Sequence, residues 1–148
     1  MKKELVVFIG NVGTGKTTYC NKHYVMGYKI IRPDDWREES LEDYSLKFNR
    51  TLRDHLRNGE NVVIDGVNMK SRSREIILNF AKGDEYKKIA IVFGKGNDES
   101  LQRRIAEPKH YTKENIKTSH EQHLNEYESP TLEEGFDEII EIEGGVLN

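Results

Sequence analysis

Residues 5–9 form an unbroken apolar run, and the glycine-rich segment that follows it at once leaves few folds open. A short run that is apolar at every position is typical of a strand buried on both faces of a sheet. Residues 10–17 read GNVGTGKT and match the pattern G-x-x-x-x-G-K-[ST] in full. A helical pattern begins directly behind them. This order of strand, loop and helix predicts an α/β fold with an anion-binding loop at its first turn.

Apolar runs and helical patterns alternate along the rest of the chain. The expected strands are residues 5–9, 29–32, 62–64, 89–93 and 138–142, and the expected helices are residues 17–24, 41–56, 73–81, 98–106 and 113–127. Ser40 would cap the second helix and Gly59 would end it. Alternation of this kind predicts a parallel sheet of about five strands with helices on both faces. No linker or repeat divides the 148 residues, so we expect one domain over residues 1–148.

The glycines of the loop allow its backbone to curl, so that successive N–H groups point at phosphate oxygens. Lys16 would reach the β- and γ-phosphates of ATP, and the Thr17 hydroxyl would ligate Mg²⁺. The residues expected to bind the nucleotide in this segment are Gly10, Gly13, Thr14, Gly15, Lys16, Thr17 and Thr18. The motif predicts binding of a nucleoside triphosphate and leaves its use open.

Residues behind the later strands disfavour two classes of nucleotide-binding protein. A GTPase switch would need an N/T-K-x-D motif, whereas GKGND follows residue 93. A motor ATPase normally has two adjacent acids after a hydrophobic strand, whereas Asp65 is followed by Gly66. A kinase needs a carboxylate across from the γ-phosphate that accepts the proton of the acceptor hydroxyl. Asp34 and Asp35 follow a strand at the edge where ligands bind, and they favour a kinase.

The block Asp34-Asp35-Trp36-Arg37 lies between the glycine-rich loop and a later strand that leads into Asp65. In this setting the chain resembles the phage-type 5′-polynucleotide kinase family. The stretch ESPTLEEGFDEI at residues 128–139 is also similar to the tails of stand-alone bacterial and phage relatives. The resemblance spans the chain nearly end to end. It implies a P-loop kinase fold, use of ATP and Mg²⁺, and phosphoryl transfer to the 5′-hydroxyl end of DNA or RNA.

The resemblance also implies roles for single residues. Asp34 would be the general base, and Arg37 would contact the phosphate next to the acceptor nucleotide. Asp65 would lie near the metal and the acceptor. Arg74 matches the family's acceptor-side spacing, with Arg72 as its rival. The positions assigned to the acceptor side are Asp34, Arg37, Asp65, Asn68 and Arg74.

In the family, arginines on a helix close over the ATP phosphates and neutralise charge in the transition state. Arg103 and Arg104 fit this helix, and Arg104 is the better positional match. A second such arginine would fall on Pro108, and Lys109 or His110 is the available substitute. Lysine does not reproduce the bidentate fork of arginine. The chain has no D-x-D-G-T motif, so we expect no accompanying 3′-phosphatase activity.

Composition limits the partners and the location. All 23 Lys and Arg lie in residues 1–117, which carry a formal charge of +6, while residues 118–148 add nine acids. This distribution favours local anion binding and disfavours coating of long DNA. No apolar run is long enough to span a membrane, and the single Cys20 fits a reducing compartment. We therefore expect a cytoplasmic protein that binds nucleic acid 5′ ends and no membrane, with its oligomeric state open.

Several conspicuous residues have a structural interpretation. His120 and His123 share one helical face, with no third metal ligand evident, so packing is expected for them. Cys20 is expected in the core. Trp36 would either stack on a nucleobase or pack in the core. Two functional alternatives stay open: a kinase that acts on a small molecule or on a hydroxymethylated base, and a nucleotide-gated binding or regulatory module.

Overall fold

The computed structural model describes residues 2–36, 41–109 and 111–142. Five parallel strands form one sheet in the order β2-β3-β1-β4-β5. The strands are β1 (Lys3–Gly10), β2 (Lys29–Ile31), β3 (Val62–Ile64), β4 (Tyr86–Gly94) and β5 (Glu138–Glu141). The predicted parallel sheet, with β5 at one edge, is confirmed.

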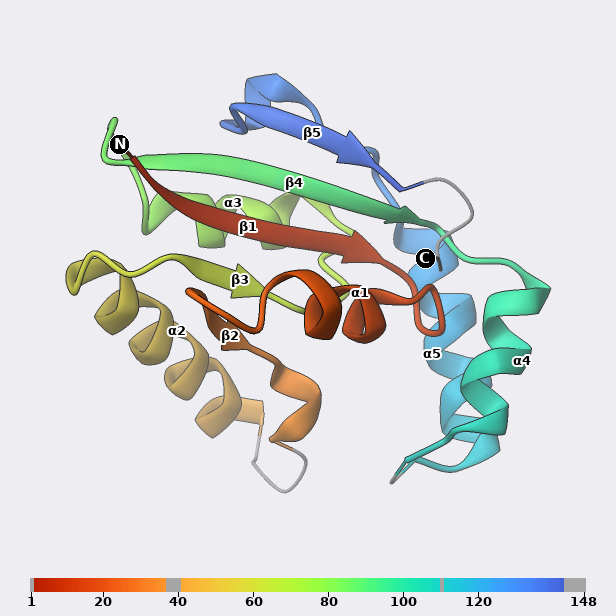
Figure 1. The fold of residues 1–148 in the computed structure, drawn as a ribbon. Coiled ribbons are helices and arrows are strands. Elements are labelled where there is room, and N and C mark those ends of the chain that lie inside the picture. The colour runs from red at the N-terminus through yellow and green to blue at the C-terminus, as the bar shows by residue number, and fades with distance from the viewer. Residues whose placement is uncertain (1, 37–40, 110, 143–148) are drawn as a thin grey trace.

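In the described part of the chain, five α-helices and two 3-10 turns connect the strands (Figure 1). The helices are α1 (Lys16–His23), α2 (Leu41–Arg57), α3 (Ser71–Asn79), α4 (Asp98–Ala106) and α5 (Lys113–Glu126), and the turns are η1 (Pro33–Asp35) and η2 (Leu132–Glu134). The expected cap Ser40 lies outside the described residues. Gly59, at φ +68°, follows α2 in the left-handed conformation expected of a helix stop.

The largest differences from the expected element boundaries, of two or three residues, include those of β4 and α3. Strand β4 begins three residues earlier because Tyr86 is buried and its hydroxyl donates to the carbonyls of Leu56 and Glu60. Helix α3 begins two residues earlier and ends at Asn79, because the N–H groups of Phe80 and Ala81 bond three residues back in a tighter turn.

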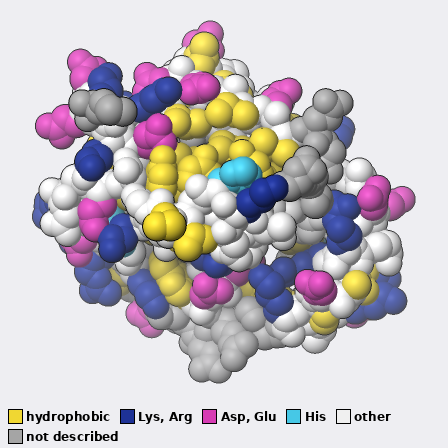
Figure 2. All heavy atoms as spheres, viewed as in Figure 1, with side chains coloured by type: hydrophobic (Ala, Val, Ile, Leu, Met, Phe, Trp, Pro, Cys, Tyr) yellow, Lys and Arg dark blue, Asp and Glu magenta, His cyan; other side chains and the backbone are white. Residues whose placement is uncertain are grey.

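Alternate residues of β1 enter two different cores, one on each face of the sheet. Leu5, Val7 and Ile9 pack with side chains of α2 and α3. Val6 and Phe8 pack with Cys20 of α1 and with apolar residues of β4. Figure 1 shows α1 in front of the sheet and α2 and α3 behind it. Figure 2 shows apolar side chains gathered over the α1 face, with charged groups around them. The expected helices on both faces are thus confirmed.

Helices α4 and α5 lie beyond the carboxyl ends of β1 and β4 (Figure 1). Helix α4 begins with a capping box between Asn97 and Ser100, and Thr112 caps α5. The two helices contact each other. They therefore form a paired unit at the edge of the sheet where the first loop emerges. Within the described ranges, no helix combines the length and apolar character that a membrane span requires.

Candidate active site

The glycine-rich loop is fixed to the sheet on both sides. The N–H of Gly10 donates to the carbonyl of Val67 (3.0 Å), and the N–H of Asn11 donates to that of Gly94 (3.1 Å). Gly13 has φ +74°, and a Cβ there would lie 1.9 Å from the carbonyl oxygen of Ser100 in α4. Only glycine fits such a close approach. The loop is therefore held between β1 and α4, with its amides at the start of α1.

Asn11 is fully buried and joins three segments. Its side-chain nitrogen donates to the carbonyls of Lys95 (2.8 Å) and His120 (2.9 Å), and its side-chain oxygen accepts from the N–H of Val12 (2.7 Å). The carbonyl of Asn11 accepts from the Thr14 hydroxyl (2.6 Å). The loop is thus tied to the segment before α4 and to α5. The motif allows any residue at this position, so the sequence carried no signal for this role.

The Lys16 ammonium lies in the loop, where it donates to the carbonyl of Asn11 (2.8 Å). Burial lowers the pKa of Lys16 to about 8, against the opposing effects of Asp65 and Asp34. Arg104 and Lys109 lower it further. Two carboxylates and two further cations thus act electrostatically on Lys16. Thr18, by contrast, is exposed on α1.

Thr17 and Asp65 present oxygen atoms to the same point beside the loop. The Thr17 hydroxyl donates to Oδ2 of Asp65 (3.0 Å), and the Asp65 side chain is only 2% exposed. A hydroxyl and a carboxylate are hard ligands of the kind that Mg²⁺ takes. Oδ2 of Asp65 also accepts from Nε of Arg32 (2.6 Å), a residue that the sequence analysis did not single out.

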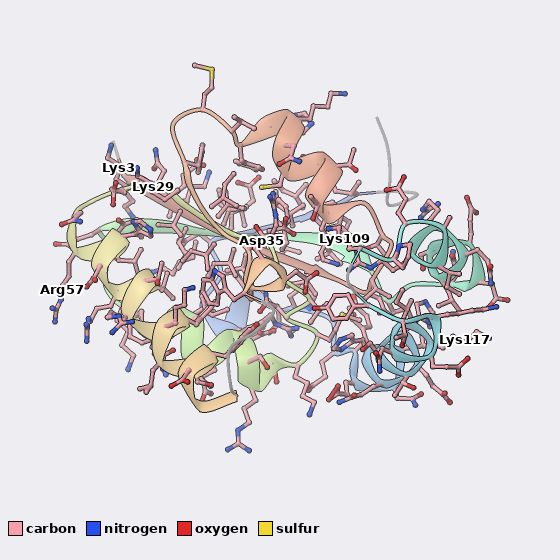
Figure 3. The ribbon with its side chains drawn as sticks, turned by 90° about the horizontal axis from the view of Figure 1, so that it is seen from below. Lys3, Lys29, Asp35, Arg57, Lys109 and Lys117 are labelled. Atoms are coloured by element: carbon pink, nitrogen blue, oxygen red, sulfur yellow. The ribbon has the colours of Figure 1, made fainter. Side chains whose placement is uncertain are left out.

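Asp34 lies in η1, which follows β2, and its carboxylate faces the α4–α5 pair. Nη2 of Arg104 is 3.7 Å from its Oδ2, and the Tyr111 hydroxyl is 3.5 Å from its Oδ1. The Arg104 guanidinium lies over the Tyr111 ring at 5.6 Å. In Figure 3, η1 with Asp35 lies at the middle of this edge, between α2 and the α4–α5 pair. The fold therefore brings Asp34 to Arg104 from a position 70 residues away in sequence.

The two arginines of α4 have different surroundings. Arg103 donates through Nε to the carbonyl of Gly13 (3.0 Å) and pairs with Glu99 (3.1 Å). Nε of Arg104 is buried and bonds to no protein group among the described residues. A buried donor without a partner is costly and is rare in folded proteins. Arg104 thus has bonding capacity to offer an anion, whereas Arg103 holds the loop. Lys109 acts electrostatically on Lys16, and His110 lies outside the described residues.

Arg74, an expected acceptor-side residue, lies inside the protein. Its side chain is fully buried and pairs with Glu134 through Nε (2.8 Å) and Nη2 (3.1 Å). Nη1 donates to the carbonyls of Asn68 and Met69. The guanidinium is therefore occupied by internal partners, and its expected contact with the acceptor stays a prediction that this arrangement does not favour. Arg72, its rival, is exposed.

Two other expected acceptor-side positions are Asn68, which makes a contact within the protein, and Arg37. The side-chain nitrogen of Asn68 donates to the carbonyl of Phe8 (2.9 Å), and Asn68 has φ +46°. The residue therefore holds the turn after β3 against β1. Arg37 lies outside the described residues, so its expected contact with the acceptor phosphate stays a prediction.

The remaining conspicuous side chains pack. Trp36 packs against the core and makes edge contacts with Tyr44 and Phe48, with the Lys47 ammonium 4.7 Å from its ring centroid. His120 is buried, and no cluster of metal-ligating side chains lies within the described part of the chain. Cys20 is fully buried, and burial raises its thiol pKa to about 11. Of the two roles considered for Trp36, the geometry favours packing.

A family model described as an AAA domain (AAA_33) matches residues 5–130. The chain belongs to this family, and the predicted P-loop kinase fold is confirmed. The glycine-rich loop is thus the nucleotide-binding loop of the family.

The chain is also similar to a protein of Acanthamoeba polyphaga mimivirus that is named as a bifunctional polynucleotide phosphatase/kinase. The two are 29% identical over 145 residues, which cover 93% of this chain and 32% of the relative. The chain therefore spans about a third of the length of that protein.

Solved structures with this fold have different acceptors in their names. A fungal RNA kinase superposes with a TM-score of 0.67 at 19% identity, covering 97% of this chain and 76% of its own. A gluconokinase from Sinorhizobium meliloti superposes with a TM-score of 0.60 at 16% identity, covering 94% of this chain and 81% of its own. These likenesses support the fold and leave the acceptor to be argued from the site.

Proposed function

We propose that the protein is an ATP-dependent kinase that phosphorylates the 5′-hydroxyl end of a nucleic acid. The observation that carries the proposal is the place of Asp34. Its carboxylate is within 3.7 Å of Arg104, and its charge acts on Lys16 in the phosphate loop. A candidate base, a loop lysine and an arginine from another helix thus lie within electrostatic range of one another, an arrangement that suits phosphoryl transfer. The mimivirus relative, named for polynucleotide phosphatase/kinase activity, supports a polynucleotide as the acceptor.

The loop amides and Lys16 would hold the β- and γ-phosphates, and Thr17 with Asp65 would hold Mg²⁺. When bound there, Mg²⁺ supplies charge neutralisation to the phosphates. A hollow of about 260 Å³ lies beside the loop and would accommodate the rest of the nucleotide. It is lined by Thr14, residues 93–97, Ser100 and Arg103. Asp34 would accept the proton of the 5′-hydroxyl as its oxygen attacks the γ-phosphorus and ADP departs. Arg104, whose buried Nε bonds to none of the residues that the structure describes, would turn from Asp34 to the transferring phosphoryl group.

Labelled ATP tests the acceptor directly. The protein is incubated with γ-labelled ATP and, side by side, a 5′-hydroxyl oligonucleotide, the same oligonucleotide already 5′-phosphorylated, free nucleosides, gluconate and duplex DNA with hydroxymethylated bases. We expect label on the 5′-hydroxyl oligonucleotide alone, removable by a phosphatase. Label on gluconate, a nucleoside or a modified base would replace this proposal with a kinase of another acceptor. Tight ATP binding without any label would indicate a regulatory module.

Nucleotide binding is expected to take up a proton near pH 8. The pKa of Lys16 is about 8, and the negative phosphates will raise it in the complex. At pH 8 roughly half of the Lys16 side chains are neutral before binding, so uptake is about half a proton and it vanishes well below pH 7. Calorimetry in buffers of different ionisation enthalpy measures this uptake. Lys16→Arg, which stays charged, is the matched control, and equal uptake by both proteins would contradict the prediction.

A further inference from the structure

We infer that Arg32 is a positioning residue that holds the Asp65 carboxylate against the Thr17 hydroxyl and compensates its charge, so that a divalent cation binds there only together with nucleotide phosphates. The inference rests on the metal site of the proposed function. It adds Arg32, a residue to which neither the motif nor the family resemblance gives a role.

The sheet places Arg32 and Asp65 side by side. Each follows the last residue of its strand, and those last residues, Ile31 and Ile64, are paired in register. The N–H of Asp65 donates to the carbonyl of Ile31 (2.9 Å). Because the two backbones are fixed at this distance, the side chains meet with Nε of Arg32 2.6 Å from Oδ2 of Asp65.

The guanidinium is fixed at both ends. Nη2 of Arg32 donates to the side-chain oxygen of Asn21 in α1 (3.0 Å), while Nε donates to Asp65. The same Oδ2 atom of Asp65 accepts from the Thr17 hydroxyl. A planar guanidinium held by α1 and β3 therefore sets the orientation of the carboxylate relative to Thr17. Because Arg32 also precedes Pro33 and Asp34 directly, it anchors the start of η1.

The charges at this point set the order of binding. The Asp65 side chain is 2% exposed and that of Arg32 is 18% exposed, so little solvent screens the pair. The net charge of the Arg32–Asp65 ion pair is close to zero, so the pair attracts a cation only weakly. Among the described residues, no group of three or more His, Cys, Asp or Glu side chains adds ligands. The missing negative charge and oxygen ligands would then come from the phosphates of the nucleotide.

Mn²⁺ binding, read by the loss of its free electron paramagnetic resonance signal, tests the inference without measuring turnover. We expect the wild-type protein to bind Mn²⁺ with ADP and only weakly without it. Arg32→Met exposes the charge of Asp65, so Mn²⁺ should bind this variant without nucleotide at least about tenfold more tightly than wild type. Adding Asp65→Asn should abolish that gain. Lys29→Met removes an exposed cation from the other end of β2 and should behave as wild type.

Mn²⁺ affinity in Arg32→Met no tighter than in wild type would overturn the inference, as would tight nucleotide-free binding by wild type. If the variant unfolds on purification, Arg32→Lys is used. Its weaker, single-point contact should give an intermediate affinity and a melting temperature that rises with Mn²⁺, and a Mn²⁺-independent melting temperature would count against the inference. Failure of the labelling assay with nucleotide-dependent Mn²⁺ binding intact would remove the proposed function and leave this inference standing.

Discussion

Asp34→Asn is expected to lower phosphoryl transfer by about 10²–10⁴-fold, the range that a general base contributes. ATP affinity should change by less than about threefold, because the side chain faces Arg104 and Tyr111 while the loop amides and Lys16 hold the phosphates. Labelled transfer to a 5′-hydroxyl oligonucleotide measures the first effect, and calorimetry with an ATP analogue measures the second. Transfer at the wild-type rate would remove Asp34 from the role of base.

Asp35→Asn is the matched control for this prediction. Asp35 is the adjacent carboxylate of η1 and is exposed. The substitution removes the same charge one residue away, so a general loss of negative potential would affect both variants alike. A loss confined to Asp34→Asn would assign the effect to one carboxylate and its position.

Glu134→Gln is expected to reduce the free energy of unfolding by about 3 kcal/mol, because it leaves the fully buried guanidinium of Arg74 without a counter-charge. For a chain of this length the melting temperature should fall by roughly 10 °C. Thermal and urea unfolding measure both quantities. At a temperature where the variant is folded, its KM for the oligonucleotide should equal that of wild type, since the guanidinium of Arg74 is buried and paired inside the protein.

Glu133→Gln serves as the control, because Glu133 is the exposed neighbour in η2 and its loss should change stability by less than about 0.5 kcal/mol. The double variant Arg74→Met/Glu134→Leu should be more stable than Glu134→Gln, because it removes both charges. A raised KM for the oligonucleotide in Glu134→Gln at wild-type stability would return Arg74 to the acceptor side.

The sheet and the phosphate loop could be predicted because both are local in sequence. Residues 5–9 carry the mark of a doubly buried strand, and the spacing of Gly10, Gly15 and Lys16 reflects a single turn of backbone. That Asp34 and Asp65 both lie at the carboxyl edge of the sheet follows from the parallel topology alone. None of these features depends on contacts between particular side chains.

The contacts that could not be predicted join residues that the fold brings together over long distances in sequence. Arg74 and Arg72 look equivalent in a helical pattern, and only Glu134, 60 residues further on, decides that Arg74 is internal. In the sequence, Arg32 is the end of a strand before a proline and carries no sign of a function. Its place beside Asp65 depends on the register between β2 and β3. Tyr111 reaches Asp34 across 77 residues. Sequence spacing carries no information on such contacts.

The buried amide of Asn11 has a mechanical consequence. It grips the segment before α4 and the carbonyl of His120 in α5 at once. If the two helices move when nucleotide binds, these hydrogen bonds would couple that movement to the backbone of the glycine-rich loop. The position of the two helices and the affinity of the loop for phosphate would then change together, because Asn11 is bonded to both parts.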